Sequence, residues 1–155
     1  MKTDNRGFTL LAALTAVLIA ALLSLITVTC VQLAVASYKR TVDYANARTL
    51  LSAGMVMLRD EIASADNVTL TGNVLSYKNE GIPSSVCFAA DGSGELRKTT
   101  FGEEKPFMQE ITADSLTFAC DTIEKTDTAV IFGNLCIKKD GRTLASIEKY
   151  TVLLV

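Results

Sequence analysis

The chain has 155 residues, so it has room for one small domain beside an apolar membrane segment. Its formal net charge of −2, with no clustered Lys and Arg, gives no basis for expecting direct binding of nucleic acid. Histidine is absent, which removes the commonest general base and the commonest metal ligand. No other constellation of catalytic, metal-binding or cofactor-binding residues replaces it, so we expect a protein that is not an enzyme.

A short basic stretch precedes a long uncharged stretch near the N-terminus. Lys2 and Arg6 come before residues 8–38, which contain no charged residue and no proline, and Lys39 and Arg40 follow. Because a spanning helix needs about 20 apolar residues, this stretch predicts a transmembrane helix. The basic residues at the two ends are nearly balanced, so the positive-inside rule is indecisive. The N-terminal tail is short enough to stay in the cytoplasm, and we therefore expect the C-terminal domain outside.

Two rival processing signals occur in the same stretch. The sequence AVA at residues 34–36 resembles the small-x-small site of a secretory signal peptidase, but the apolar region before it is far longer than in signal peptides. A lipoprotein signal could be read around Cys30, but Thr29 stands where a small Gly or Ala is expected. Both are minor alternatives to a membrane helix that the mature protein retains.

The helical pattern continues beyond the uncharged stretch. Residues 39–66 are predicted to form an amphipathic helix, because apolar residues recur there at steps of three and four. No proline interrupts the chain from Phe8 to about Ser64, so we expect one continuous helix with Gly54 as its weak point. The residues of the predicted apolar stripe are Tyr44, Ala47, Leu51, Met55, Leu58, Ile62 and Ala65.

Residues 67–155 have the pattern of a β-rich domain. Short stretches rich in β-branched and aromatic residues alternate with turn residues, and both Pro83 and Pro106 are expected between strands. The expected fold is therefore α+β, with a long N-terminal helix packed on a small, mostly antiparallel C-terminal sheet. The strand candidates are 68–70, 74–77, 86–89, 95–100, 116–120, 129–138 and 143–154.

The four cysteines fall into two groups. Cys30 lies in the apolar stretch, where a thiol behaves as a small hydrophobic group. Cys87, Cys120 and Cys136 lie in the polar remainder, and an exported domain could form one disulfide from them. We favour Cys120–Cys136, because this bond would join neighbouring strand candidates. Three buried free thiols are an equal alternative.

The N-terminal features together resemble the type IV pilin superfamily, which includes type IV pilins, type II secretion pseudopilins and competence pseudopilins. The resemblance lies in the sequence RGFTLL at residues 6–11, the apolar helix that continues as an amphipathic helix, and the C-terminal sheet. It implies that residues 1–7 are a leader peptide. It also implies that a prepilin peptidase cleaves between Gly7 and Phe8 and methylates the new N-terminus at Phe8. The filament-core segment would then be residues 8–38.

Three further stretches are similar to the J-type minor pseudopilins and related minor pilins. They are LRDEIASADNV at residues 58–68, LSY at 75–77 and GELRK at 94–98. The expected partners are other pilin or pseudopilin subunits, the prepilin peptidase and the membrane. The expected location is the cytoplasmic membrane, and the cell surface or a filament after assembly.

The chain departs from the family pattern at the fifth residue after the expected cleavage site. The resemblance implies assembly contacts through Phe8, Leu10, Leu11 and residue 12, where the family usually carries a glutamate that meets a neighbour's N-terminal amine. Here this residue is Ala12. Without this glutamate we expect a minor subunit present in few copies. Some tip subunits of the family also lack the glutamate, which makes a tip or initiating role one hypothesis for its place in the filament. The alternative function is a signal-anchored extracytoplasmic binding or sensing domain that does not polymerise.

Overall fold

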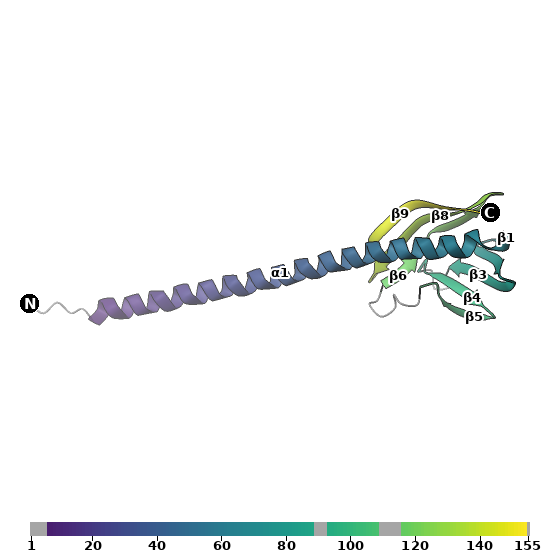
Figure 1. The fold of residues 1–155 in the computed structure, drawn as a ribbon. Coiled ribbons are helices and arrows are strands. Elements are labelled where there is room, and N and C mark those ends of the chain that lie inside the picture. Colours follow the sequence, from purple (N-terminus) through teal and green to yellow (C-terminus); the bar gives the residue numbers. More distant parts are fainter. Residues whose placement is uncertain (1–5, 89–92, 109–115, 155) are drawn as a thin grey trace, which may run out of the picture. The chain divides into compact units, whose positions relative to one another are not determined.

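A computed structural model of the chain describes residues 6–88, 93–108 and 116–154, with the backbone alone described for residues 6–9 and 88. These residues form one helix and nine strands, most of which are labelled in Figure 1. The chain divides into two compact units, Met1–Val42 and Asp43–Val155. The elements are α1 (Arg6–Ala63), β1 (Asp66–Thr71), β2 (Val74–Asn79), β3 (Ile82–Phe88), β4 (Leu96–Thr100), β5 (Glu103–Pro106), β6 (Leu116–Ala119), β7 (Thr122–Lys125), β8 (Ala129–Lys139) and β9 (Arg142–Leu153).

The α+β fold predicted from the sequence is confirmed. The strands of the second unit form two antiparallel sheets, one in the order β1-β2-β3-β4-β5 and one built around β8. In the second sheet β9 pairs along the whole of β8, so β6 and β7 share the other edge of that strand. The expected hairpins are present as β1–β2, β3–β4 and β8–β9.

The part of α1 within the second unit presents one buried stripe to the sheets. Its buried residues recur at steps of three and four, as the amphipathic pattern predicts. They join a hydrophobic core with Leu75 and Tyr77 of β2, Phe118 of β6 and Phe132 of β8. Tyr44, expected in the stripe, is 48% exposed and is not part of this core. The buried helix residues are Ala47, Leu51, Gly54, Leu58 and Ile62.

Gly54 is a close-packing position as well as a point of low helix propensity. A Cβ atom at Gly54 would lie 2.6 Å from Cζ of Phe118 and 2.8 Å from Sδ of Met108. Contacts this short do not occur between real atoms, so the missing side chain lets the ring of Phe118 lie directly against the helix backbone. The glycine therefore trades helix propensity for contact with β6.

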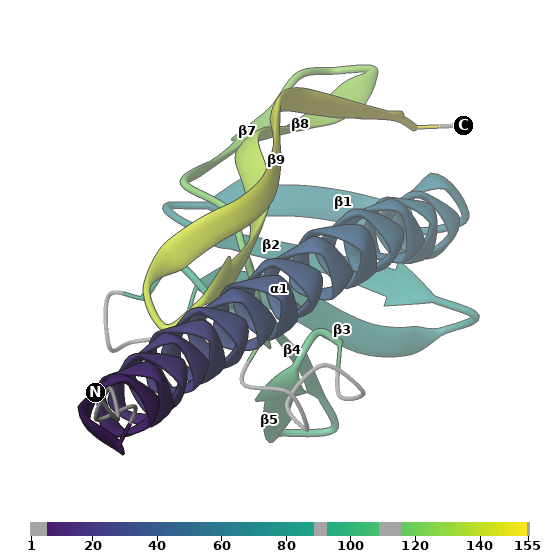
Figure 2. The ribbon, with the colours of Figure 1, turned by 90° about the vertical axis from the view of Figure 1, so that its left-hand side faces the viewer.

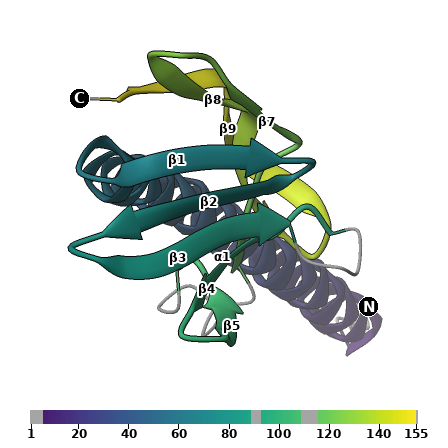
Figure 3. The same ribbon diagram turned by 90° about the vertical axis from the view of Figure 1, so that its right-hand side faces the viewer.

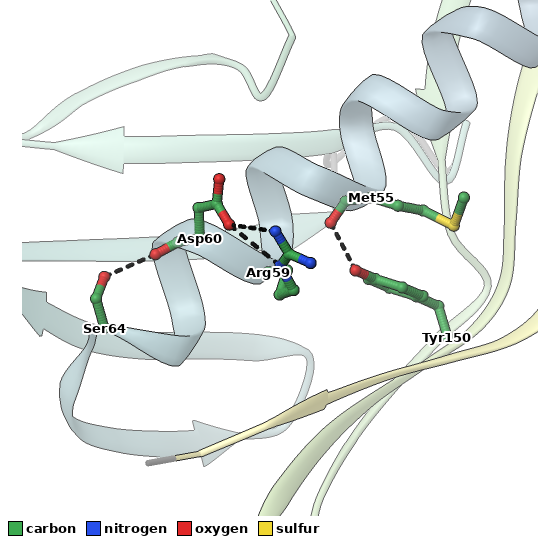
Figure 4. Close-up of polar contacts among 5 residues, drawn as sticks. All are labelled: Met55, Arg59, Asp60, Ser64 and Tyr150. Carbon is green, nitrogen blue, oxygen red and sulfur yellow. Dashed lines mark hydrogen bonds and ion pairs between the residues drawn. The ribbon is translucent and has the colours of Figure 1, made fainter.

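Polar contacts join the second half of α1 to both sheets. Nζ of Lys98 on β4 lies 2.5 Å from a carboxylate oxygen of Glu61. Nζ of Lys139 at the end of β8 lies 2.9 Å from Oδ1 of Asp43. On β9 the hydroxyl of Tyr150 donates a hydrogen bond of 2.7 Å to the backbone oxygen of Met55. Figure 4 shows this last contact beside the helix turns that hold Arg59, Asp60 and Ser64.

Replacing Tyr150 with phenylalanine should lower the free energy of unfolding by about 1 kcal/mol, because it removes one partly buried hydrogen bond and little apolar area. Thermal or denaturant unfolding of the full chain in detergent micelles, followed by circular dichroism, measures this change. The matched control is Tyr44→Phe on the exposed side of α1, which should change stability by less than about 0.5 kcal/mol. Equal effects of the two substitutions would show that the bond contributes nothing.

The two prolines lie inside strands and not between them, so this expectation is wrong. Pro106 ends β5, at the edge of its sheet, where the ladder stops. Pro83 is tolerated within β3 because of its place in the ladder. The turn at residues 80–81 has two residues, so the pair Asn79 and Ile82 exchanges hydrogen bonds and the next pair, Lys78 and Pro83, does not. On its other side, Pro83 lies past the end of the β3–β4 ladder, whose last pair is Ser84 and Thr100. The N–H that Pro83 lacks therefore has no partner to lose in β4.

Candidate membrane and assembly segment

The large apolar side chains of the first unit are exposed. From Leu10 to Tyr38 they are between 49% and 71% exposed. Among the described residues, α1 is the one helix long and apolar enough to cross a membrane. A continuous apolar surface of this length is unfavourable in water, so this segment needs lipid or other apolar helices around it.

Four hydroxyl groups of this segment are satisfied by the helix itself. Thr15 donates to the backbone oxygens of Leu11 and Ala12, at 3.1 and 2.9 Å. Ser24, Thr27 and Thr29 bond in the same way to oxygens three or four residues earlier. An unpaired hydroxyl would be costly in hydrocarbon, and these bonds remove that cost without a partner helix. These six hydrogen bonds from four threonine and serine residues therefore keep the helix surface compatible with lipid.

The residues of the expected cleavage site lie inside the helix. Because α1 begins at Arg6, Gly7 and Phe8 belong to its first turns, and the leader residues 1–5 lie outside the described residues. Nothing in the sequence stops a helix between Gly7 and Phe8, since a single glycine only weakens it. The expected boundary between leader and helix is thus a position in a terminal helix turn, where fraying is common.

The expected assembly residues begin the exposed stretch. Leu10 and Leu11 are 67% and 63% exposed, and Ala12 is exposed as well. For Phe8 the structure describes only the backbone. Consecutive residues of a helix point about 100° apart, so Leu10, Leu11 and Ala12 face different directions and could each contact a different molecule around the helix. They form a surface and not a pocket.

Cys120 and Cys136 are buried free thiols, although the strand candidates expected to carry them do pair. Cys136 lies opposite Ala119, and Cys120 lies one residue beyond, with its Sγ donating to the backbone oxygens of Thr122 and Gly133. Burial raises the pKa of Cys120 to about 11 and also raises the pKa of Cys136. Both therefore hold their protons at neutral pH and oxidise slowly. The Cys120–Cys136 disulfide stays a prediction for an oxidised form.

A polar cluster lies where the end of α1 crosses the first sheet. The buried hydroxyl of Tyr77 lies near Glu61, and Glu61 is paired with Lys98. Burial, and then the negative charge of Glu61, raise the pKa of Tyr77 far above its usual value. The ion pair between Glu61 and Lys98 joins the end of α1 to β4. No group of three or more potential metal ligands occurs within the described ranges.

Comparison with known proteins gives no relative for this chain. No family model, no curated protein and no solved structure matches it. The features available for assigning a function are thus the N-terminal pattern, the exposed apolar helix and the surfaces of the folded unit.

Proposed function

We propose that this chain is a minor pilin or pseudopilin subunit that is inserted in the membrane, cleaved after Gly7 and assembled in few copies into a filament. The observation that carries the proposal is the unbroken helix, whose side chains are exposed from Leu10 to Tyr38 and which then buries a stripe from Ala47 to Ile62. One helix serves both as the membrane segment and as the spine of the folded unit. The sequence RGFTLL at residues 6–11 adds the processing signal.

The exposed helix suits both of the environments that such a subunit occupies. Lipid and neighbouring apolar helices make the same demand, which is contact with apolar side chains and no unpaired polar group. The hydroxyl groups bonded within the helix meet this demand in both places. Small residues allow helices to approach closely, and the segment carries several of them near its start. These are Ala12, Ala13, Ala16, Ala20 and Ala21.

The proposed topology places the N-terminus in the cytoplasm and the folded unit outside, with the cell surface or a filament as its destination after assembly. The proposed partners are other pilin-like subunits and the prepilin peptidase, and the filament is a type IV pilus, a type II secretion filament or a DNA-uptake filament. The role is structural and not enzymatic. Because Gly7 and Phe8 lie in a helical turn, that turn must unwind before a peptidase can cleave it.

The deciding measurement is the N-terminal mass of the protein isolated from its native membrane. Cleavage should give a chain that begins at Phe8 with one added methyl group on its amine. The variant Gly7→Val should retain the leader. The matched control is Gly54→Ala, a substitution at a glycine far along the chain from the cleavage site, which should leave cleavage unchanged. An intact leader in the native protein would contradict the proposal and support a signal-anchored domain that does not polymerise.

The variant Ala12→Glu should raise the number of copies incorporated into filaments. A carboxylate is tolerated in an apolar assembly when it is paired, and at this position it could meet the N-terminal amine of a neighbouring subunit. The matched control is Ala13→Glu, which adds the same charge one residue away and should lower incorporation. Quantitative immunoblotting of sheared filaments against membranes measures both. If Ala12→Glu leaves incorporation unchanged, the assignment to a capping position at the tip is wrong.

A further inference from the structure

The five-stranded sheet has one face against the helix and one face that no described element covers. Figures 2 and 3 show the two sides of this unit, with α1 in front of β1–β3 in the first and behind them in the second. Leu75, Tyr77 and Val86 point toward the helix and are buried. Because side chains alternate along a strand, Ser76 and Ser85 point to the uncovered face. That face therefore carries polar side chains, and no described element covers it.

A row of hydroxyl side chains crosses the uncovered face. Thr69 of β1 lies opposite Ser76 of β2. Ser76 in turn lies opposite Ser85 of β3, which lies opposite Thr99 of β4. Neighbouring strands are about 4.8 Å apart, so the row extends over roughly 14 Å. The hydroxyl of Thr69 already donates to the backbone oxygen of Ser76, at 3.4 Å, and keeps its acceptor capacity. The four aligned hydroxyl groups therefore give a regular array of hydrogen-bond acceptors, and Ser76, Ser85 and Thr99 add donors.

The row forms the floor of a hollow of about 590 Å³. This volume lies within the range of small-molecule sites. The hollow is also lined by Asn67, Lys78 and Phe101. It thus combines hydroxyl groups with an amide, a cation and one aromatic ring. Among the described residues, Lys78 is the one charged side chain that lines it.

Two residues of this hollow have a left-handed backbone conformation, which is unfavourable for one of them. Asn67 and Phe101 both have φ of 54°, in the left-handed region. Asparagine is tolerated there, but a bulky aromatic residue is not, at a cost of about 1–2 kcal/mol. The equivalent turn positions in the other hairpins with this geometry hold the polar residues Glu80 and Asp140. Phe101 is also 76% exposed, so burial does not compensate for the strain.

We propose that this hollow binds an acidic saccharide. Serine and threonine hydroxyl groups match the mixed donor and acceptor pattern of sugar hydroxyls, and an exposed ring offers a flat apolar surface to the C–H side of a sugar. Lys78 would pair with a carboxylate on the ligand. An added β-strand fits less well, because the backbone groups under this face are already paired within the sheet. The inference does not depend on cleavage or filament assembly.

The test uses the full chain in detergent micelles with two fluorescently labelled probes, an acidic oligogalacturonate and neutral maltohexaose. Fluorescence polarisation should show binding of the acidic probe and weaker binding of the neutral one. Lys78→Gln should reduce the difference between the probes. Ser85→Ala should weaken binding roughly threefold to tenfold through the loss of one hydrogen bond. If wild type binds neither probe, or binds both equally, the proposal is overturned.

Phe101→Asn separates binding from folding. Asparagine suits the left-handed turn, so this variant should unfold at a higher temperature than wild type while binding the acidic probe about tenfold more weakly. The matched control is Glu80→Asn, which changes the same turn position in the β2–β3 hairpin, outside the hollow. It should stabilise without affecting binding. Unchanged binding by Phe101→Asn, or an equal loss in Glu80→Asn, would contradict the assignment.

Discussion

Two aspartates introduced together as Leu22→Asp and Ile26→Asp should remove the chain from the membrane. Both positions lie near the middle of the uncharged stretch and are more than half exposed on α1. A charged residue at the centre of a spanning helix costs about 2.5–3.5 kcal/mol, so the pair costs roughly 5–7 kcal/mol. The expected result is loss of the chain from the carbonate-washed membrane fraction, measured by immunoblotting.

The matched control is the pair Ser52→Asp and Val56→Asp. These residues have the same spacing, lie on the same helix and are also exposed, but they belong to the folded unit. In water two aspartates at this spacing cost only a few tenths of a kcal/mol. The control chain should therefore stay in the membrane fraction. If both variants are retained equally, the uncharged stretch is not the membrane segment.

Replacing Gly54 with alanine should destabilise the folded unit, against the usual effect of this change in a helix. Helix propensity alone favours alanine by about 1 kcal/mol. The added Cβ would lie 2.6 Å from the ring of Phe118, which is buried and cannot move away freely. Overpacking of this kind costs about 1–3 kcal/mol. Chemical denaturation of the full chain in micelles should show a lower free energy of unfolding.

The ring of Phe118 provides the control for this prediction. A Phe118→Leu background removes two of the three atoms closest to the added Cβ and leaves Sδ of Met108, so Gly54→Ala should cost less there than in wild type. Ser52→Ala, on the exposed side of the same helix turn, should be neutral or slightly stabilising. A stabilised Gly54→Ala protein would mean that the close contact with β6 is absent.

The helix could be predicted from the sequence because its signal is local and repeated. Residues 8–38 lack charge altogether, and apolar residues follow at helical spacing, so the predicted end near Ser64 differs from the observed end at Ala63 by one residue. The role of Gly54 could not be predicted. Its environment depends on Phe118, which is distant in the sequence and reaches the helix through the tertiary fold.

The shorter strands were harder to predict. β5, with the sequence EEKP, and β7, with TIEK, have too few apolar residues for an alternating pattern, and both form because a neighbouring strand pairs with them. β3 begins at Ile82, four residues before the expected start at Val86, because pairing with β2 and the exposed N-side of Pro83 allow the proline inside the strand. In each case tertiary pairing outweighs local preference.

The hydroxyl row illustrates a site that no single segment reveals. Thr69, Ser76, Ser85 and Thr99 are unremarkable residues in separate strands, and they align because of the register of three hairpin pairings. A shift of one residue in any of these pairings would turn part of the row to the opposite face. Phe101 is the one local signal of this site in the sequence. It precedes Gly102 in a two-residue turn, a position that favours a small polar residue.

The three polar contacts between α1 and the sheets also determine how this unit responds to a pulling force. They occur at Asp43, Met55 and Glu61, and their partners lie on β8, β9 and β4. Because α1 is continuous through these three residues, tension applied along its axis loads the three contacts together. Because the buried stripe lies between them, the helix must slide past both sheets to be extracted. The unit should therefore resist extension in shear rather than by peeling.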